Sequence, residues 1–115
     1  MKVERVQLNT HNGTHLDVPW HFHSTIVKGK KSLTIDEIPL ERCFQSGVKL
    51  DFRHFDDGYM VTADDIQKQL DKIEHRLSPL EIVLVNTRAV KVYGSDDYVS
   101  SGYGVGYEAT IILLE

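Results

Sequence analysis

Histidines are concentrated near the start of this chain, where four of the six lie in the run His11-Asn-Gly-Thr-His15-Leu-Asp17-Val-Pro19-Trp-His21-Phe-His23. The imidazoles of His11 and His15, with the carboxylate of Asp17, form a donor set suited to a divalent cation such as zinc or manganese. Three protein ligands leave a coordination position open for water, which distinguishes a catalytic metal site from a structural one. An aspartate can also bridge two metals, so the site could be mononuclear or binuclear. We expect His21 to be a fourth ligand or a nearby proton carrier.

The backbone of this run is expected to be extended, because its glycine and proline disfavour a helix. In an extended chain alternate residues share a face, which places His15, Asp17 and His21 together. Gly13 lets the chain turn sharply, so that His11 can join the same centre. The run therefore predicts a metal site on an edge strand that ends near its proline.

Seven residues of the run resemble the signature of the cyclase-like metal-dependent hydrolases, a group that includes bacterial kynurenine formamidases and isatin hydrolases. They are His11, Gly13, Thr14, His15, Asp17, Pro19 and His21. Further stretches are similar to family segments in the family order, and they are residues 34–36, 38–40, 50–53, 82–84 and 98–110. The resemblance therefore covers nearly the whole chain.

The resemblance also implies residue roles and a fold. His11, His15 and Asp17 would hold the metal, Asp17 could bridge to a second ion, and His21 would be the catalytic residue that moves protons. The implied fold is a swivelling β/β/α arrangement with a mixed sheet and flanking helices, and members of the group are usually oligomers. We therefore expect a homo-oligomer.

Three features depart from the family pattern. Family members are much longer and supply a further His and Glu from their second half, and they have a strand before the signature. Arg88 stands where many relatives have glycine. We therefore expect residues 1–115 to be a single domain that is an N-terminal portion of a longer cyclase-like hydrolase domain.

The expected activity is metal-dependent hydrolysis of small amides, of the arylformamide or cyclic amide type, at C–N bonds other than peptide bonds. Metal-activated water would attack the carbonyl carbon, and His21 would pass a proton to the leaving nitrogen. The alternative is a truncated or degenerate family member that binds metal or partner subunits without catalysis. Nothing in the sequence assigns a substrate-binding residue.

Apolar periodicity outlines the elements that must carry the metal site. Strands are expected at 3–8, 15–18, 48–53 and 82–85, the last as an interior strand. Thr62 and Asp65 predict a capped helix that runs to near Pro79, with an apolar stripe of Ile66, Leu70, Ile73 and Leu77. A helical turn is expected within 38–44, a glycine turn at 56–58 and a last helix near Glu108. The predicted class is α/β, with an incomplete mixed sheet and flanking helices.

Several other side chains have structural interpretations. Trp20, Phe22 and Cys43 are expected to pack in the core. His54 and His75 are expected at the surface, and His23 in a loop. The lysines at 28, 30 and 31 are expected to form a solvated charged run.

Composition excludes several classes of protein. Thirteen Lys and Arg against 17 Asp and Glu give a net charge of −4, which disfavours nucleic-acid binding. One cysteine cannot form an intrachain disulfide, and no apolar run approaches the roughly 18 residues of a membrane span. The opening residues lack the apolar core of a signal peptide. We expect a cytoplasmic protein whose partner is a small-molecule amide rather than a nucleic acid or a membrane.

Overall fold

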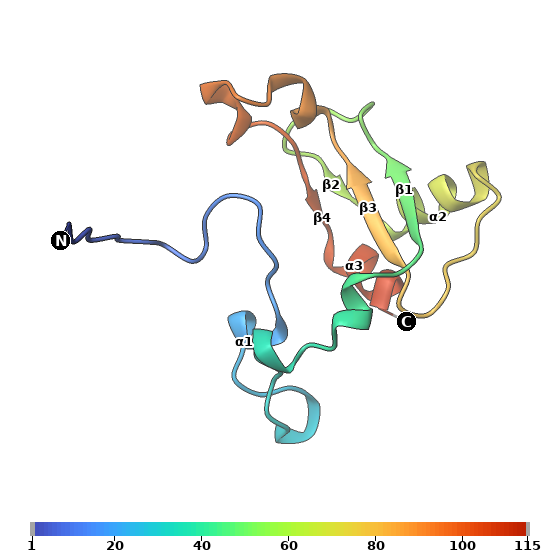
Figure 1. Ribbon diagram of the computed structural model, residues 1–115. Coiled ribbons are helices and arrows are strands. Elements are labelled where there is room, and N and C mark those ends of the chain that lie inside the picture. The colour runs from blue at the N-terminus through green and yellow to red at the C-terminus, as the bar shows by residue number, and fades with distance from the viewer. Residues whose placement is uncertain (1, 115) are drawn as a thin grey trace. The chain divides into compact units, whose positions relative to one another are not determined.

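The computed structural model describes residues 2–114 and has an α/β architecture of short helices and small parallel sheets (Figure 1). The predicted α/β class is therefore confirmed. The chain forms two compact units, which divide between Cys43 and Phe44. No helix in the described range is both long enough and apolar enough to cross a membrane.

The first unit is built from turns rather than strands. It contains α1 (Pro19–Phe22) and the 3₁₀ turns η1 (Val27–Gly29), η2 (Ile35–Glu37) and η3 (Leu40–Cys43). The last of these confirms the helical turn predicted within 38–44. The strands predicted at 3–8 and 15–18 are wrong, because both stretches are irregular and neither pairs with another described segment. A strand needs a partner for its backbone groups, and that pairing is not a local property of the sequence.

Burial in the first unit also differs from expectation. Trp20 is 45% exposed, Phe22 is 76% exposed and Cys43 is exposed, so the prediction that they pack in a core is wrong. The physical reason is that no hydrophobic side chain is fully buried among the described residues of this unit, whose one buried side chain is the polar Ser32.

The second unit is organised around two parallel strand pairs. β1 (Gly47–Asp51) pairs with β3 (Ile82–Asn86), and β2 (Met60–Val61) pairs with β4 (Gly104–Val105). These confirm the strands predicted at 48–53 and 82–85. The prediction that the latter strand is interior is wrong, because β1 is its one described neighbour and Leu84 is 55% exposed.

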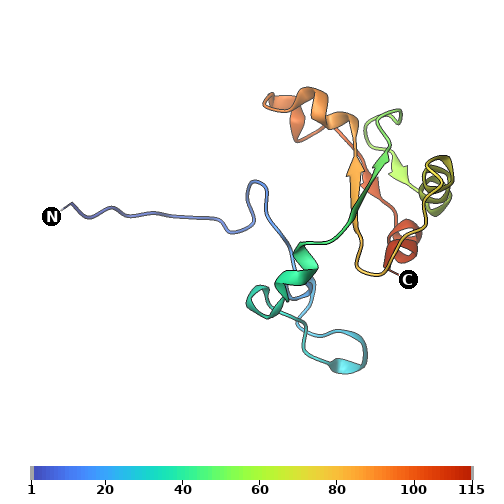
Figure 2. The same cartoon turned by 45° about the vertical axis from the view of Figure 1, so that its right-hand side comes forward.

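Two helices lie on one side of β1. The connection between β3 and β4 contains two further turns. α2 (Ala63–Lys72) contacts β1, and α3 (Tyr107–Leu114) packs beside α2 (Figures 1 and 2). The 3₁₀ turns η4 (Arg88–Val92) and η5 (Asp96–Tyr98) lie between β3 and β4. α3 confirms the helix predicted near Glu108.

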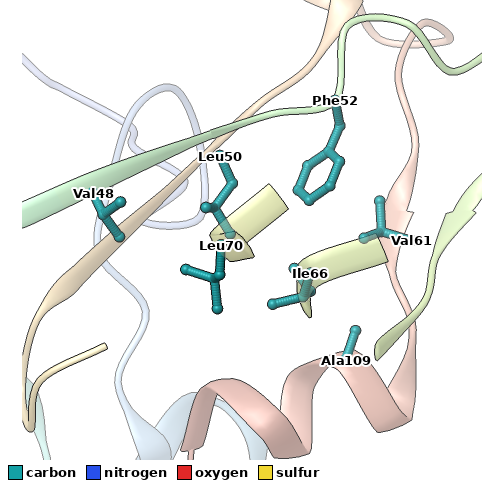
Figure 3. Close-up of a cluster of buried hydrophobic side chains, with 7 residues drawn as sticks. All are labelled: Val48, Leu50, Phe52, Val61, Ile66, Leu70 and Ala109. Carbon is teal, nitrogen blue, oxygen red and sulfur yellow. The ribbon is translucent and has the colours of Figure 1, made fainter. Parts of the chain in front are cut away.

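A hydrophobic core joins these elements of the second unit. Its buried side chains converge between β1, α2 and α3, as Figure 3 shows; they are Val48, Leu50, Phe52, Val61, Ile66, Leu70 and Ala109. Val48, Leu50 and Phe52 alternate along β1 and its extension with exposed or half-buried residues, as the sequence pattern predicts. Phe52 is fully buried, and truncating such a side chain to alanine costs about 3–5 kcal/mol.

The start of α2 has the predicted capping box. The Thr62 hydroxyl accepts a hydrogen bond from the Asp65 amide at 3.2 Å, and the Asp65 carboxylate accepts one from the Thr62 amide at 3.0 Å. The Tyr59 hydroxyl also donates to Asp65, at 2.9 Å. Burial raises the pKa of Asp65, but the hydrogen bonds from Thr62 and Tyr59 outweigh it and leave that pKa below its ordinary value.

The end of α2 differs from the prediction, because the helix stops at Lys72 rather than near Pro79. Glu74 has a left-handed φ of 52°, and the next amide, of His75, donates to the Leu70 carbonyl at 3.0 Å. The Glu74 amide donates to the Asp71 carbonyl at 3.1 Å. These two bonds form a Schellman motif that satisfies the last carbonyls of the helix.

His75 and Glu81 then tie the helix end to the start of β3. The His75 Nε2 atom lies 3.0 Å from both Glu81 carboxylate oxygens, and the Glu81 side chain is 5% exposed. His75 is therefore half-buried and in hydrogen-bond contact with Glu81, rather than simply solvated as predicted. His54 is exposed, as predicted.

Candidate metal centre

Gly13 and Pro19 shape the backbone that carries the candidate site. Gly13 has a φ of 69°, a conformation that residues with a side chain rarely adopt, and it reverses the chain between His11 and His15. Pro19 occupies the first position of α1, where its fixed φ is favourable and its missing amide hydrogen is not needed. His21 is therefore carried on a turn of helix, and the prediction that it reaches Asp17 along an extended strand is wrong.

Three side chains that could hold a metal ion meet in this segment: His11, His15 and Asp17. The His15 Nε2 atom lies 2.8 Å from His11 Nδ1. The Asp17 Oδ1 atom lies 3.3 Å from His11 Nδ1 and 3.4 Å from His15 Nε2. The circle through these three atoms has a radius of about 1.8 Å, shorter than the roughly 2.0–2.2 Å of zinc–ligand bonds. A single point can therefore lie at bonding distance from all three donors.

The tautomer of His15 follows from the hydrogen-bond partner of its Nδ1 atom. The His15 Nδ1 atom lies 2.8 Å from the Gly13 carbonyl oxygen, which can only accept a hydrogen bond. The Nδ1 atom must then carry the proton and donate it, which leaves a lone pair on Nε2 directed at His11 and Asp17. A backbone carbonyl that orients a histidine in this way is typical of metal sites.

The short separation between His11 Nδ1 and His15 Nε2 is that of a hydrogen bond or of two ligands of one cation. Two lone pairs facing each other at 2.8 Å repel, so either a shared proton or a cation must lie there. Asp17 adds negative charge to the same point. The cluster can therefore hold a proton or a cation at this point, and its donor set suits a divalent cation.

His21 lies beside the three donors rather than among them. Its ring stacks on that of His11, with centroids 4.6 Å apart and planes 12° apart. Its Nδ1 atom lies 3.9 Å from Asp17 Oδ1, longer than a hydrogen bond. The structure thus brings together all four of the residues singled out from the sequence, with His21 adjacent to the other three.

The four residues open onto a cleft of about 400 Å³ within the first unit. Its other lining residues are mainly apolar, and they are Thr10, Leu16, Val18, Trp20, Thr34 and Ile35. A concave site with apolar walls and a few convergent polar groups is typical of small-molecule binding.

A small polar network, which the sequence analysis did not find, positions one wall of this cleft. The Trp20 amide donates to the Leu33 carbonyl at 3.1 Å, and Lys31 Nζ lies 5.9 Å from the centre of the Trp20 ring. Lys31 also pairs with Glu37 at 2.9 Å, while its side chain stays exposed as predicted for the solvated run. Hydrogen bonds from the Thr34 backbone, and then from Lys31, lower the pKa of Glu37 to about 2.

One signal in the sequence could have revealed this network. Thr34 and Glu37 have the spacing of a capping box, and both reciprocal hydrogen bonds are present at η2. His23, by contrast, lies outside the metal cluster and hydrogen-bonds Thr25, as expected of a loop residue.

The comparison with protein-family models agrees with the resemblance carried by residues 11–21. Residues 2–115 match the model of a family named Cyclase and described as "Putative cyclase". No curated protein and no solved structure matches the chain significantly.

Proposed function

The chain belongs to the cyclase family, and from that premise we propose that it is a metal-dependent hydrolase of small amides. The substrates would be arylformamides or cyclic amides, cleaved at C–N bonds other than peptide bonds, as the resemblance of residues 11–21 implies. The observation that carries the proposal is the convergence of three metal-binding donor atoms beside a further imidazole, that of His21.

His11 Nδ1, His15 Nε2 and Asp17 Oδ1 are the atoms that would hold the cation. Neutral imidazoles with a carboxylate suit zinc or manganese, and the spacing of the three atoms fits one ion at bonding distance from each. A divalent cation bound there would polarise a substrate carbonyl and lower the pKa of a coordinated water toward about 7.

His21 is the residue we assign to proton transfer. Because its Nδ1 atom faces Asp17, its Nε2 atom is the one that would donate a proton to the leaving nitrogen. The stacked ring of His11 restricts the plane of the His21 ring.

The apolar wall of the cleft would hold the organic body of the substrate. Leu16, Trp20 and Ile35 are among the apolar residues that line it. Binding there would place the amide carbonyl near the donors and exclude water from the rest of the substrate.

The test is a comparison of metal content and amide hydrolysis in two variants of the purified chain. We expect Asp17→Ala to lose both bound zinc or manganese and activity toward an N-formyl arylamine. We expect His21→Ala to keep the metal while losing turnover by about 10²-fold or more, the size expected for a general acid. His23→Ala, in which a histidine outside the cluster is removed, is the matched control and should keep both.

A second candidate function is metal binding without catalysis. It is favoured by the exposure of all three donors, since a catalytic site normally excludes water around the reacting groups. Stoichiometric metal with no hydrolysis in the unaltered chain would support this candidate. Unchanged metal content in Asp17→Ala would contradict both candidates.

A further inference from the structure

A basic cleft of about 460 Å³ lies wholly within the second unit. Its lining residues are all polar or charged, and they are Asp51, Arg53, His54, Gln69, Lys72 and Lys91. Its size falls within the range of small-molecule sites. Below, the basic cleft means the space that these six residues line.

The basic cleft is assembled from three separate segments. Asp51 is the last residue of β1 and Arg53 lies two residues further on, whereas Lys91 lies in η4, which follows β3. Lys72 comes from α2. The cleft thus lies at the carboxyl end of a parallel strand pair, which is where open α/β sheets commonly bind ligands.

The charge of the basic cleft is opposite to that of the chain. With His54 neutral, its lining carries three positive charges and one negative charge, whereas the chain has a net charge of −4. The negative charge, on Asp51, is already paired within the cleft, because Arg53 Nε and Nη2 donate hydrogen bonds to the Asp51 carboxylate at 2.8 and 2.6 Å. These bonds hold the pKa of Asp51 well below its ordinary range, so the pair remains ionised and neutralises itself.

The positive charge that remains comes from Lys72 and Lys91. Neither forms an ion pair with any other residue in the described range. The position of Lys72 at the end of α2 has a structural explanation, since a cation is favourable near the negative end of a helix dipole. That explanation does not account for the convergence of Lys91 and the Asp51–Arg53 pair on the same space.

We propose that the basic cleft binds a tetrahedral dianion, namely phosphate, either free or as the phosphoryl group of an organic monoester. The two lysines match the two negative charges of the phosphate. The side-chain amide of Gln69 and the ring of His54 supply hydrogen-bond donors for its oxygens. This site uses no residue of the candidate metal centre, so it stands whether or not the proposed hydrolase activity is found.

The test is a titration of the metal-free, ¹⁵N-labelled chain with inorganic phosphate at constant ionic strength, followed by amide chemical shifts. We expect saturable shifts confined to residues 51–54, 69–72 and 88–92. Lys72→Gln with Lys91→Gln should weaken binding about ten-fold or more, because both unpaired charges are removed. Lys28→Gln with Lys30→Gln removes the same charge from the first unit and should leave the affinity unchanged.

Glycerol 2-phosphate, titrated in parallel, distinguishes the two sources of the ligand. Tighter binding of the ester would assign the site to a phosphorylated organic molecule, and tighter binding of inorganic phosphate would assign it to the free ion. Either result supports the proposal.

Scattered or unsaturable shifts with both probes would overturn the proposal, because they would show only a diffuse ionic atmosphere. Equal affinity in the unaltered chain and the Lys72/Lys91 variant would overturn it as well. Should the double variant fail to fold, Lys91→Gln alone replaces an exposed side chain and should weaken binding measurably.

Discussion

At the scale of single residues, the account depends on the orientation of His15 by the Gly13 carbonyl. A hydrogen bond of 2.8 Å to that oxygen selects the tautomer whose Nε2 lone pair faces His11 and Asp17. Gly13 supplies this carbonyl from a left-handed backbone conformation, and a Cβ atom at this position would meet nothing within 4 Å. The glycine is therefore needed for its backbone conformation and not for space.

Gly13→Ala should weaken zinc binding by about 5- to 30-fold. The reason is that alanine loses about 1–2 kcal/mol in the left-handed conformation, and relief of that strain would move the carbonyl away from His15. Zinc affinity measured by competition with a chromogenic chelator checks this. Gly13→Asn is the matched control, because asparagine tolerates that conformation, and it should bind zinc more tightly than the alanine variant. Equal losses in both variants would contradict the role given to this backbone.

The residue types of the candidate site could be predicted from the sequence, but its geometry could not. His11, His15, Asp17 and His21 stand together as the motif indicates. The prediction that an extended strand continues to His21 was wrong, because Pro19 starts a helical turn and no strand partner is present in the described residues. Strand formation depends on distant partners, which a single sequence does not identify.

At the scale of secondary-structure elements, sequence signals that depend only on neighbouring residues were the most reliable. The Thr62 cap, the alternation of β1 and the glycine turn at 56–58 were all confirmed. The end of α2 was missed because Glu74, and not glycine or asparagine, occupies the left-handed position of the Schellman motif. The usual sequence signal for a helix end is therefore absent.

Glu74→Gly should raise the free energy of unfolding by about 0.5–1 kcal/mol. Glycine adopts the left-handed conformation without the penalty that glutamate incurs, and the Glu74 side chain is exposed. Urea denaturation followed by circular dichroism measures the difference. Arg76→Gly, two residues further on, lacks this benefit and should not stabilise. A loss of stability in Glu74→Gly equal to that in Arg76→Gly would count against the motif.

The tie between His75 and Glu81 gives the second unit an acid-sensitive contact. Hydrogen bonds from the Ser78 amide, and then from His75, lower the pKa of Glu81. A lowered carboxyl pKa contributes stability that is complete above the unfolded value of 4.5 and is lost as the pH falls through the lower folded value. Unfolding curves recorded between neutral pH and pH 3 should therefore show a smaller loss of stability in Glu81→Gln than in the unaltered chain. Parallel losses in the two proteins would refute this.

At the scale of the whole molecule, the two units differ in how they are stabilised. The second unit contains all of the buried hydrophobic side chains among the described residues, whereas the first unit carries the candidate metal centre. Metal binding can contribute folding energy where a hydrophobic core is small. The metal would therefore order the first unit as well as supply chemistry.

Exposed apolar side chains in the second unit support the proposal that the chain forms a homo-oligomer. β3 has one described strand neighbour, and Leu84, Val90 and Val99 are each more than half exposed. A strand edge without a partner in the described range and exposed apolar side chains both favour association. Sedimentation velocity should show a concentration-dependent increase in mass. Leu84→Lys should reduce that increase, whereas Gln67→Lys, which adds the same charge on the outer side of α2, should not. A monomer at all concentrations would contradict the proposal.

The central claim is that His11 Nδ1, His15 Nε2 and Asp17 Oδ1 share one divalent cation. Long-range ¹⁵N–¹H correlation spectra of the histidine rings, recorded while zinc is added to one equivalent, test these atoms individually. The account predicts that the Nδ1 resonance of His11 and the Nε2 resonance of His15 move to metal-bound positions. The ring-nitrogen resonances of His23, His54 and His75 should not move. The Asp17→Ala substitution should greatly weaken the change at His11 and His15. Zinc-induced shifts that spare His11 and His15, or that persist unchanged in Asp17→Ala, would contradict it.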